Sequence, residues 1–450
     1  MNKTFFTTAA ALIALASCDN ADEPAKSSAK TETNATEIIM SGTVEAGTEI
    51  RLDRHLVIPE GESLTLSPGV TIIVSDTGVG VNHVPVEIIA KGNLYCLGTA
   101  DDPVTISVNP SKRVAANTFK GLWGGIVATE SCTEMVIDHA VIEYTGGQVI
   151  EGSPSATAGI YTAGDDAYPH ITTTNTNGRY VITNSVIRNG WSDGVYLMGG
   201  EAIIADNVFA ANGFSGAEAV NIKAGVKADI AGNVMFSPNT NGLKLSSSGQ
   251  SETRGQAIAN AYNNTIINAG WRRDGEKGGC VYAEKNVLAN VVNNLMVNCK
   301  FRAMTPSFKN PNTPDGGFDD KSVIDYNFYA SGDLKSEIVF PEESNVAYPY
   351  EGYNYNHKSY NPAADQHSPV ASSQNLLDPM FESYDINSVS LTSTDFNQAW
   401  DFHLRPGSPA LTGAAAPGLI TPLFADGLTV NGQSYRSPQP EPWFGAFGTK

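Results

Sequence analysis

The chain lacks the local signatures of several common enzyme classes. Its 450 residues contain no Ser/His/Asp nucleophile signature, and its Gly-rich phrases have the spacing of turns and not of a phosphate-binding loop. It has only 5 cysteines, and no spacing among them resembles a zinc site. No long stretch carries the apolar repeat of an amphipathic helix. The sequence therefore gives no support to these kinds of site and argues against a helical fold.

Positive charge is also scarce. Lys and Arg number 28 against 47 Asp and Glu, which gives a formal net charge of −19 at pH 7. This balance opposes nonspecific contact with nucleic acid, because phosphate backbones attract basic surfaces. It is ordinary for a secreted, soluble surface. We therefore expect no nucleic-acid partner.

The N-terminal residues are typical of an exported bacterial protein. Lys3 supplies a basic start, and Phe5–Ala14 form an apolar stretch that is too short to cross a membrane as a helix. The Leu-Ala-Ser-Cys quartet that ends at Cys18 resembles a bacterial lipobox, in which the cysteine becomes the lipidated first residue. The alternative is an ordinary signal peptide with an incidental cysteine. Residues 1–18 therefore predict a lipoprotein signal peptide, and the polar residues 19–38 predict a flexible tether.

The middle of the chain repeats a short phrase in which an apolar-alternating stretch runs into an asparagine. Period-two alternation, rich in β-branched residues and broken by Asn and Gly, is typical of short strands joined by turns. A repeat of this size cannot bury its own apolar face and must stack on its neighbours, which predicts a β-solenoid. The asparagines aligned in these copies are Asn184, Asn207, Asn233, Asn264 and Asn294.

The recurring asparagine has a physical reason besides turn formation. Side-chain amides on successive coils can hydrogen-bond along the stack and satisfy polar groups that point into a narrow core. The alternative is that these residues only form turns. Both interpretations predict the same architecture, and neither gives the asparagines a role in chemistry.

This pattern resembles the right-handed parallel β-helix superfamily, whose members have a pectate-lyase-like fold and share an inward asparagine ladder. The resemblance covers residues 40–330 and implies an all-β, right-handed parallel β-helix domain at 39–332. Members of the superfamily have many activities, so the fold says little about chemistry. Besides the repeated phrase, the stretches that resemble secreted bacterial members are 56–61, 64–72, Gly92–Thr99 and Trp123–Ile126.

Residues 333–450 differ from the repeats and are rich in Tyr, Pro and Asn. Within them, Asp401–Leu411 and Phe444–Gly448 resemble the closing segment of secreted β-helix proteins. A solenoid needs caps over its open apolar ends. We therefore expect an irregular C-terminal region that caps and flanks the last coils.

Four cysteines remain after Cys18. Outside the cytoplasm they could pair, and Cys280 and Cys299 lie about one coil apart, within reach of a disulfide. The alternative is that each packs in the core as a small apolar residue. The sequence leaves both states open for Cys96, Cys132, Cys280 and Cys299.

A second phrase recurs in the coils, and its third position is of functional interest. In copies such as Gly194–Leu197 and Gly242–Leu245, the second and fourth residues are apolar and should point inward. The third residue should then point outward, because strand side chains alternate. Tyr rings offer platforms for sugars, and Lys and Arg attract carboxylate or sulfate groups. The predicted outward column is Val127, Tyr161, Tyr196, Asn221, Lys244, Tyr282 and Arg302.

Basic residues gather near the end of this column. Between positions 268 and 309, seven basic residues accompany three acidic ones, although the chain as a whole is acidic. Trp271, Arg272 and Arg273 lie in an insertion that could build a wall beside the sheet. This local excess predicts an anion-binding surface.

Polysaccharide lyases of this fold place their site on an outward strand face, and the resemblance implies roles for several residues. In such enzymes a basic residue removes the proton beside a uronate carboxylate, while a cation neutralises that carboxylate. On this pattern Lys244 is the base, Arg302 neutralises the charge, and Tyr196 and Tyr282 stack or donate a proton. Lys244 would need burial or cationic neighbours to lose its proton. The alternative is a solvated strand lysine.

Two acidic groups suggest other chemistry. Hydrolysis needs two carboxylates at a set separation, and Asp165 with Asp166, near His170, is the best such pair, although a solvated turn is the simpler explanation. We expect no cofactor and no bound metal. The alternative is Ca²⁺ held through oxygen ligands by an acidic loop that lacks EF-hand spacing and contains Asp315, Asp319, Asp320 and Asp325.

The sequence thus predicts a monomeric extracytoplasmic lipoprotein that binds or processes a polysaccharide, an acidic one included, on an outward β-helix face. The sharper form of this hypothesis is β-elimination of a uronate-containing glycan with Lys244 and Arg302 as catalytic residues. A lipid anchor would hold the protein to the cell envelope, facing the periplasm or the cell surface. The competing interpretation is a non-catalytic structural or adhesive envelope protein. The predicted substrate-binding residues are Tyr161, Tyr196, Asn221, Tyr282, Trp271, Arg272 and Arg273.

Overall fold

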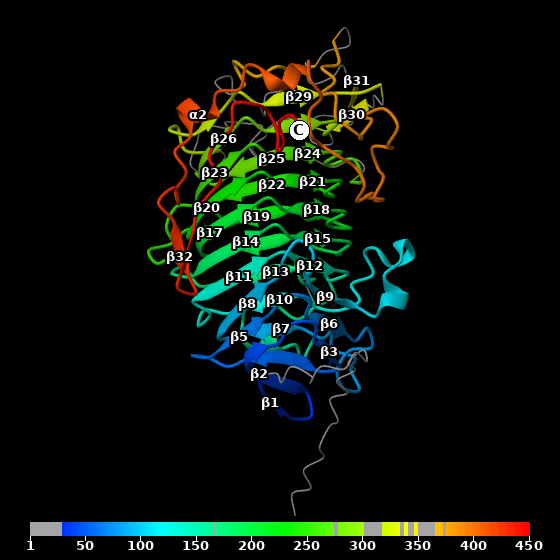
Figure 1. Ribbon diagram of the computed structural model, residues 1–450, viewed down its shortest axis with the longest axis vertical. Coiled ribbons are helices and arrows are strands. Elements are labelled where there is room, and N and C mark those ends of the chain that lie inside the picture. Colours follow the sequence, from blue (N-terminus) through cyan, green and yellow to red (C-terminus); the bar gives the residue numbers. More distant parts are fainter. Residues whose placement is uncertain are drawn as a thin grey trace, which may run out of the picture.

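The protein is an elongated stack of β-coils, as a computed structural model shows (Figure 1). The coils contribute strands to three sheets, which we name A, B and C, and the strands of successive coils run parallel within each sheet. The structure therefore confirms the predicted right-handed parallel β-helix. The described residues are 29–164, 167–273, 278–300, 317–333, 365–371 and 375–450, with the backbone of two strands at 337–340 and 346–349.

Sheet A begins with the first half of β2 (Glu37–Val44), whose second half belongs to sheet B. The later strands of sheet A are β4 (His55–Ile58), β7 (Ile88–Ala90), β10 (Ile126–Ala128), β13 (Ile171–Thr173), β16 (Val195–Leu197), β19 (Val220–Ile222), β22 (Asn241–Ser246) and β25 (Gly279–Glu284).

The other two sheets follow the same order along the stack. Sheet B continues with β5 (Ser63–Leu66), β8 (Asn93–Leu97), β11 (Glu134–Asp138), β14 (Arg179–Thr183), β17 (Gly200–Ala205), β20 (Val226–Ala231), β23 (Ile258–Tyr262), β26 (Leu288–Val292) and β28 (Val323–Ile324). Sheet C contains β3 (Glu49–Leu52), β6 (Thr71–Val74), β9 (Val104–Val108), β12 (Ala140–Glu143), β15 (Val186–Arg188), β18 (Val208–Ala210), β21 (Val234–Phe236), β24 (Thr265–Ile267), β27 (Leu295–Val297) and β29 (Phe328–Ala330).

The core lies between the three sheets and is made by alternate residues of each strand. In sheet A, Ile126, Ile171 and Val195 stand in register on successive coils and are fully buried. Burial of an aliphatic side chain of this size contributes about 1.5–3 kcal/mol. Because each coil buries its row only against the coils on either side, the alternation in the sequence fixes both the strand register and the direction of stacking.

An asparagine ladder runs through this core, as predicted. The Nδ2 of Asn207 donates to Oδ1 of Asn233 at 2.9 Å, and the same bond repeats up the stack through Asn264, Asn294 and Asn327. The backbone N–H of each donor residue bonds the same oxygen, so every ladder amide is satisfied.

The first position of the ladder differs from the prediction by one residue. Ser185, and not Asn184, precedes Asn207 in the ladder, because its N–H donates to Oδ1 of Asn207 at 3.0 Å. Asn184 instead has a left-handed backbone (φ 51°) and an exposed side chain that donates to Asp138. Asparagine tolerates this conformation at a sharp bend. At the other end, the N–H of Asn327 donates to the Ser368 hydroxyl, so a serine ends the ladder on both sides.

The structure bears in part on the predictions for the N-terminal tether and for the pairing of the cysteines. The signal peptide, Cys18 and most of the tether lie outside the described residues. Within the predicted tether, Lys30–Thr33 form strand β1, which pairs antiparallel with β2 and covers the first coil. The four remaining cysteines are all buried thiols, with no disulfide between Cys280 and Cys299.

The C-terminal region does more than cap the stack, because its described part lies along the outside of two sheets. Phe424, Leu428 and Val430 pack on outward residues of sheet B such as Val181, and the buried Asp229 accepts hydrogen bonds from Phe424 N and from the Ser437 hydroxyl. This segment also contains helix α2 (Ala416–Leu419) and the hairpin of β32 (Leu428–Val430) and β33 (Gln433–Tyr435), whereas β30 (Glu337–Phe340) and β31 (Val346–Pro349) pair with each other.

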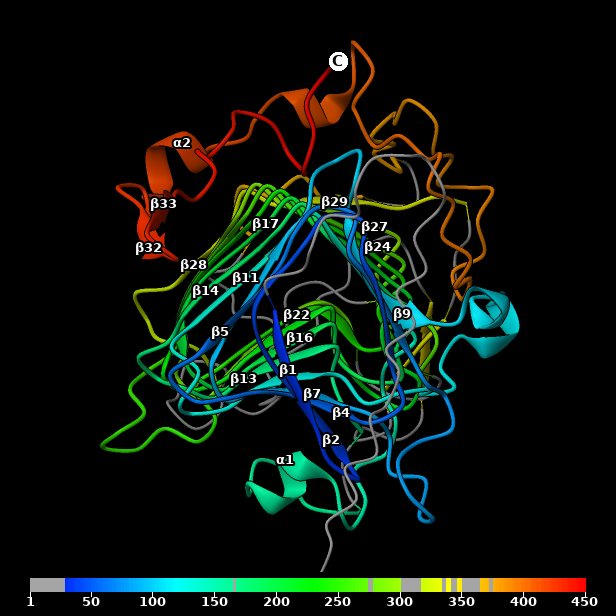
Figure 2. The ribbon, with the colours of Figure 1, turned by 60° about the horizontal axis from the view of Figure 1, so that its bottom comes forward.

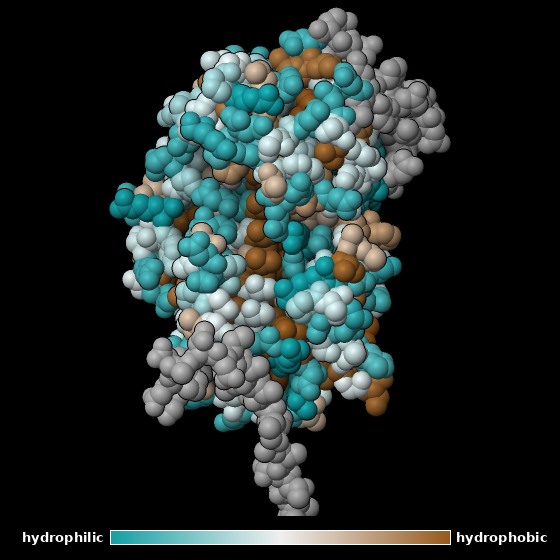
Figure 3. All heavy atoms as spheres, turned by 45° about the vertical axis from the view of Figure 1, so that its right-hand side comes forward, coloured by the Kyte–Doolittle hydropathy of each residue, from teal (hydrophilic) through white to brown (hydrophobic). Residues whose placement is uncertain are grey.

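On sheet C, Phe381, Phe402 and Phe444 of the same region pack on outward residues that include Phe236 and Phe328. Figure 2 shows the C-terminal segment on the side of the molecule opposite sheet A. Helix α1 (Pro154–Thr157) lies on the sheet A side. Of the three outer faces, that of sheet A is therefore the one that the described C-terminal residues do not cover. On the face seen in Figure 3, apolar atoms form a narrow stripe along the long axis between hydrophilic flanks.

Candidate functional site

The outer face of sheet A carries a row of polar side chains on its later strands. Tyr196, Asn221, Lys244 and Tyr282 occupy matching positions on β16, β19, β22 and β25. Tyr196, Lys244 and Tyr282 are half-buried, and Asn221 is 5% exposed. The structure therefore brings four residues of the predicted column into one row, with neighbours about 4.8 Å apart along the sheet. Arg302, the predicted end of the column, lies outside the described residues.

Tyr161 does not belong to this row, which corrects the predicted register. Thr172 of β13 stands between Val127 and Tyr196 in the sheet. Tyr161 lies instead in the loop that contains α1, and its hydroxyl is 2.5 Å from the Thr172 hydroxyl. The Gly-Ile-Tyr-Thr phrase at 159–162 imitates the coil phrase, but it belongs to an insertion that crosses the sheet from outside.

Arg272 is a structural tie between coil turns and does not reach the row. Its guanidinium donates to the carbonyls of Asn212, Gly213 and Ser237 and to the Ser237 hydroxyl, and it lies 4.7 Å from the Phe119 ring centroid. Burial lowers the pKa of Arg272 to about 10. This bonding corrects the idea that its cation is presented to a substrate.

The neighbours of Arg272 are placed in the same turn region. Trp271 is buried, and its indole N–H donates to the Asn298 carbonyl. The carbonyl of Arg273 accepts from the Lys300 ammonium at 3.0 Å. The described part of this insertion therefore shows contacts within the turns of the solenoid, and a role in substrate binding stays a prediction for Trp271 and Arg273.

Two buried carboxylates beside the row escaped the sequence analysis. Asp193 and Glu218 occupy matching positions on successive coils, each three residues before an outward residue of the row. They are only 7% and 6% exposed. Asp193 Oδ1 accepts from the backbone N–H of Glu218 at 2.7 Å. The Asn221 amide donates weakly to both carboxylates, at 3.3 Å to Asp193 and 3.2 Å to Glu218.

Two acidic groups at such close range cannot both ionise at ordinary cost. Burial and then the charge of Glu218 raise the pKa of Asp193 well above its usual range. The Asn241 amide meanwhile donates to Glu218 Oε1 at 3.1 Å. The arrangement favours a proton on Asp193.

Lysines lie on the other side of the same row. The Lys223 ammonium is 5.5 Å from the Tyr196 ring centroid, and the Lys244 ammonium is 5.8 Å from that of Tyr282. Lys244 also forms an ion pair with Glu284 at 3.6 Å. Burial and then the neighbouring Lys244 charge lower the pKa of Lys223. Lys223 is therefore the lysine of this face whose amine becomes available more readily than usual.

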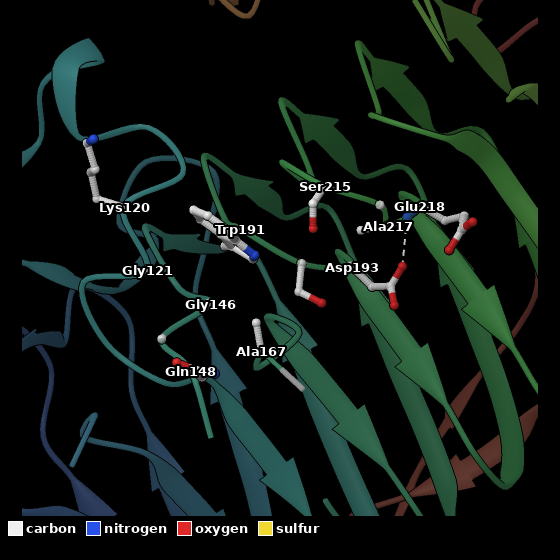
Figure 4. A pocket seen from close by; sticks show the side chains of 13 residues that line it. Lys120, Gly121, Gly146, Gln148, Ala167, Trp191, Asp193, Ser215, Ala217 and Glu218 are labelled. Carbon is white, nitrogen blue, oxygen red and sulfur yellow. Dashed lines mark hydrogen bonds between the residues drawn. The ribbon is translucent and has the colours of Figure 1, made fainter. Parts of the chain in front are cut away.

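A cleft opens beside the carboxylate pair, with a volume of about 500 Å³. Figure 4 shows that Trp191, Asp193 and Glu218 line it from neighbouring coils, with Lys120 across the opening. The Trp191 ring lies 4.5 Å from that of Phe214, which is 53% exposed. An aromatic pair beside carboxylates is a surface on which a sugar ring can stack while its hydroxyls donate hydrogen bonds.

Asn221 supplies one more polar atom at the centre of the cluster. Its Nδ2 is engaged by both carboxylates, but its Oδ1 is buried without a hydrogen-bond partner in the described part of the chain. A buried acceptor without a donor costs about 1–3 kcal/mol. A hydroxyl that reached this oxygen would relieve that cost, which makes the oxygen a candidate hydrogen-bond acceptor for a ligand.

The other acidic groups considered from the sequence do not assemble a site in the described regions. Asp165, Asp166 and Asp315 lie outside the described residues. His170 is fully buried, and its ring nitrogens face the carbonyls of Asp193 and Arg188. Among the described residues, no group of three or more His, Cys, Asp or Glu is placed to hold a metal ion.

Asp319 and Asp325 serve local structure. Asp319 accepts from the Gln256 side chain and from the N–H of Lys321, while Asp325 pairs with His367 at 2.6 Å. Asp320 lies in the turn beside Asp319. A Ca²⁺ site in this loop stays a prediction.

Comparison with known proteins adds no family. No protein-family model, no curated protein and no solved structure matches the chain. None of the helices among the described residues has the length and apolar character needed to cross a membrane. The functional argument therefore rests on the geometry of the outer face of sheet A.

Proposed function

We propose that this chain binds a uronate-containing polysaccharide on the outer face of sheet A and cleaves it by β-elimination. The observation that carries the proposal is an acid and a base over one strip of sheet. Asp193 has a raised pKa and keeps a proton, whereas Lys223 has a lowered pKa and gives up a proton more easily. Titratable neighbours whose environments push their pKa values apart in this way are typical of acid–base catalysis.

The reaction assigns one step to each group. The Lys223 amine takes the proton on the sugar carbon next to the carboxylate. The electron pair of that C–H bond forms the C=C double bond of the product, and the bond to the leaving sugar oxygen breaks. Asp193 gives its proton to that oxygen, and water later restores the starting protonation states. No oxidant, reductant or further reactant is needed.

The other residues of the row support binding. The Lys244 cation faces the uronate carboxylate and draws electrons from the carbon that loses its proton. Asn221 Oδ1 accepts a hydrogen bond from a sugar hydroxyl, because that oxygen has no partner in the described part of the chain. Tyr196, Tyr282 and Trp191 provide faces for stacking. Relative to the sequence hypothesis, this proposal moves the base from Lys244 to Lys223.

The cellular setting of the proposal comes from the N-terminal sequence alone. Export by a signal peptide and lipidation at Cys18 would hold a monomer at the cell envelope, on the periplasmic side or the surface. The proposed location agrees with the resemblance of the repeats to secreted, pectate-lyase-like β-helix proteins. Polysaccharides of that compartment would be the partner.

The test uses the protein from residue 29 onward with a panel of uronate-containing polysaccharides. Ultraviolet absorbance reports the unsaturated product of elimination. Lys223→Ala and Asp193→Asn should each lower kcat by about 10²–10⁴-fold, the usual contribution of a general base or acid. Lys227→Ala is the matched control, because this exposed lysine follows on β20 and pairs with Glu201 on sheet B.

Three other results would redirect the proposal. Product formation that survives Lys223→Ala but is lost in Lys244→Ala would return the base to Lys244. Retention on a glycan gel without product would leave a binding protein. If the protein shows no retention and forms no product, the structural or adhesive role is favoured and the proposal is removed.

A further inference from the structure

The outward row of sheet A changes character at one step. On the earlier coils it consists of Val57, Ile89, Val127 and Thr172, and all four are buried. The next residue is Tyr196, and from there the row is polar. One continuous strip of sheet is therefore divided into a covered part and a part that carries the candidate site.

The covering element is a flap, which we define as residues 146–164 with 167 and 168. Val149 and Tyr168 of the flap form one buried apolar cluster with Val127 of β10. Its Tyr161 hydroxyl meets Thr172, the last covered position of the row. Figure 2 shows its helix α1 on the outside of sheet A. The flap ends where the polar row begins.

The flap is fastened to the sheet and is not a loose loop. Glu87, directly before β7, is fully buried, and its Oε1 accepts from the Ser155 N–H and from the Tyr168 hydroxyl, both at 3.1 Å. The Ser155 hydroxyl donates to the Tyr168 oxygen at 3.0 Å. Buried hydrogen bonds of this kind hold a segment in one position.

The base of the flap also forms part of the cleft. Gly146, Gly147, Gln148 and Ala167 line it on one side, and Trp191, Asp193 and Glu218 line it on the other side. A polymer that follows the polar row toward the earlier coils therefore meets the flap next to the carboxylate pair. It cannot continue along the sheet, because Val127 and Thr172 are already covered.

We infer that the flap is an end wall, so that the site receives the terminus of a glycan chain and not its middle. This inference rests on the proposed function and specifies its substrate as a chain end. A fixed wall beside the reacting groups makes cleavage proceed from the chain terminus. The products therefore have one size from the start of the reaction. An open strip would instead admit internal segments of the polymer.

The test compares two preparations of one glycan that differ in the number of chain ends per gram. Partial depolymerisation that raises the ends about tenfold should raise the initial rate per gram about tenfold at subsaturating glycan, because kcat/KM then counts ends. Viscosity should fall slowly relative to product formation. Equal rates per gram with an early collapse of viscosity would overturn the end wall and leave the proposed cleavage intact.

A shortened flap sharpens this test. The N–H of Gly164 donates to the Val149 carbonyl at 2.8 Å, so residues 150–163 can be replaced by an Asn-Gly turn. Loss of α1 and Tyr161 lowers the wall over Thr172 and should shift the variant toward internal cleavage, with an earlier fall in viscosity. Tyr161→Phe is the matched control, because it keeps the wall and removes only one hydroxyl. An unchanged product pattern in a folded, shortened variant would contradict the inference.

The comparison of chain ends decides the matter in wild-type protein even when the shortened variant does not fold. A protein that binds without cleaving is tested by the same preparations in a retention assay, where end-rich glycan should compete more strongly per gram. Equal competition would overturn the end wall alone. Absence of any retention or product would remove the inference together with the proposed function.

Discussion

The outer face of sheet A and the outer faces of sheets B and C arise from the same strand alternation but differ in what covers them. On sheets B and C the C-terminal region packs on outward apolar residues such as Val181 and Phe236. On the later strands of sheet A the outward residues are Tyr196, Asn221 and Lys244, on the side away from that region.

This difference separates stability from chemistry within one solenoid. A coil has three outer faces, and the chain uses two of them to bury a long irregular segment. The described C-terminal residues leave the later coils of the third face uncovered, so this face can keep polar groups that would be costly elsewhere. The Asp193–Glu218 pair carries such a cost in free energy, because two carboxyl groups are held close together with little exposure to water. Local instability of this kind is expected at functional sites.

The largest predicted effect is on the covered side. Phe444 is fully buried against Phe328, with ring centroids 5.3 Å apart. Phe444→Ala should lower the free energy of unfolding by about 3–5 kcal/mol, because the lost contacts leave a cavity. Urea unfolding measures this change. Leu419→Ala is the control in the same region, since Leu419 is 45% exposed and should change stability by under about 0.5 kcal/mol. Similar small effects in both variants would show that the covering segment adds little stability.

The next effect concerns the fastening of the flap and depends on pH. Burial raises the pKa of Glu87 from its ordinary value of 4.5 to about 7. The folded state therefore keeps this proton while the unfolded state has released it. The contribution of the Glu87 proton to the free energy of unfolding is fully present below about pH 4.5. It is lost as the pH rises to about 7, and the total loss is about 3 kcal/mol. In Glu87→Gln this loss disappears, so the stability difference between the two proteins should change across that window and be constant above it.

Other groups around Glu87 are the same in both proteins and cancel in this comparison. His55 accepts the backbone N–H of Glu87 and has a pKa lowered by burial to about 4, so it gives a slope of opposite sign. Tyr168 and Ser155 bond the Glu87 carboxyl, and burial raises the pKa of Tyr168 above the tested range. Urea unfolding at several pH values provides the measurement. A difference that does not vary between about pH 4.5 and 7 would refute the assignment of this slope to Glu87.

The smallest predicted effect on stability lies on the open side. Lys244 pairs with Glu284 at 3.6 Å, and its side chain keeps 24% of its exposure. Lys244→Ala should change the free energy of unfolding by under about 1 kcal/mol, as is usual for such pairs. The same substitution should weaken retention on an acidic glycan, because the row loses a cation. A large loss of stability here would blur the division between the two kinds of face.

Most of the fold follows from the sequence because the constraint repeats. Alternation in one coil is ambiguous, but only one register buries the apolar residues of every coil at once. The ladder at Asn207, Asn233, Asn264 and Asn294 was predictable for the same reason. Its first position was not, because Asn184 and Ser185 are adjacent small polar residues. Only the backbone conformation at Asn184 decides which of them points into the core.

The candidate site was harder to predict because insertions and burial break the repeat. Tyr161 sits in a phrase that matches the coils, whereas the true strand at Ile171–Thr173 lacks the glycine of that phrase. Asp193 and Glu218 look like ordinary turn acids in the sequence. Their recurrence at one position of successive coils was a usable signal. Their burial, which gives the chemistry, arises only when the coils stack.

The asparagine ladder also bears on how such a chain can change length over evolution. Each amide donates toward the following coil and accepts from the preceding one, so every coil of the ladder presents the same polar interface above and below. Duplication of a whole coil would extend the ladder without leaving an amide unpaired. The C-terminal region, however, reaches back to Glu134 through the N–H of Asn431 and spans a fixed length of stack. All the coils that carry the ladder follow Glu134, so the ladder would tolerate a duplicated coil there while the C-terminal region opposes it.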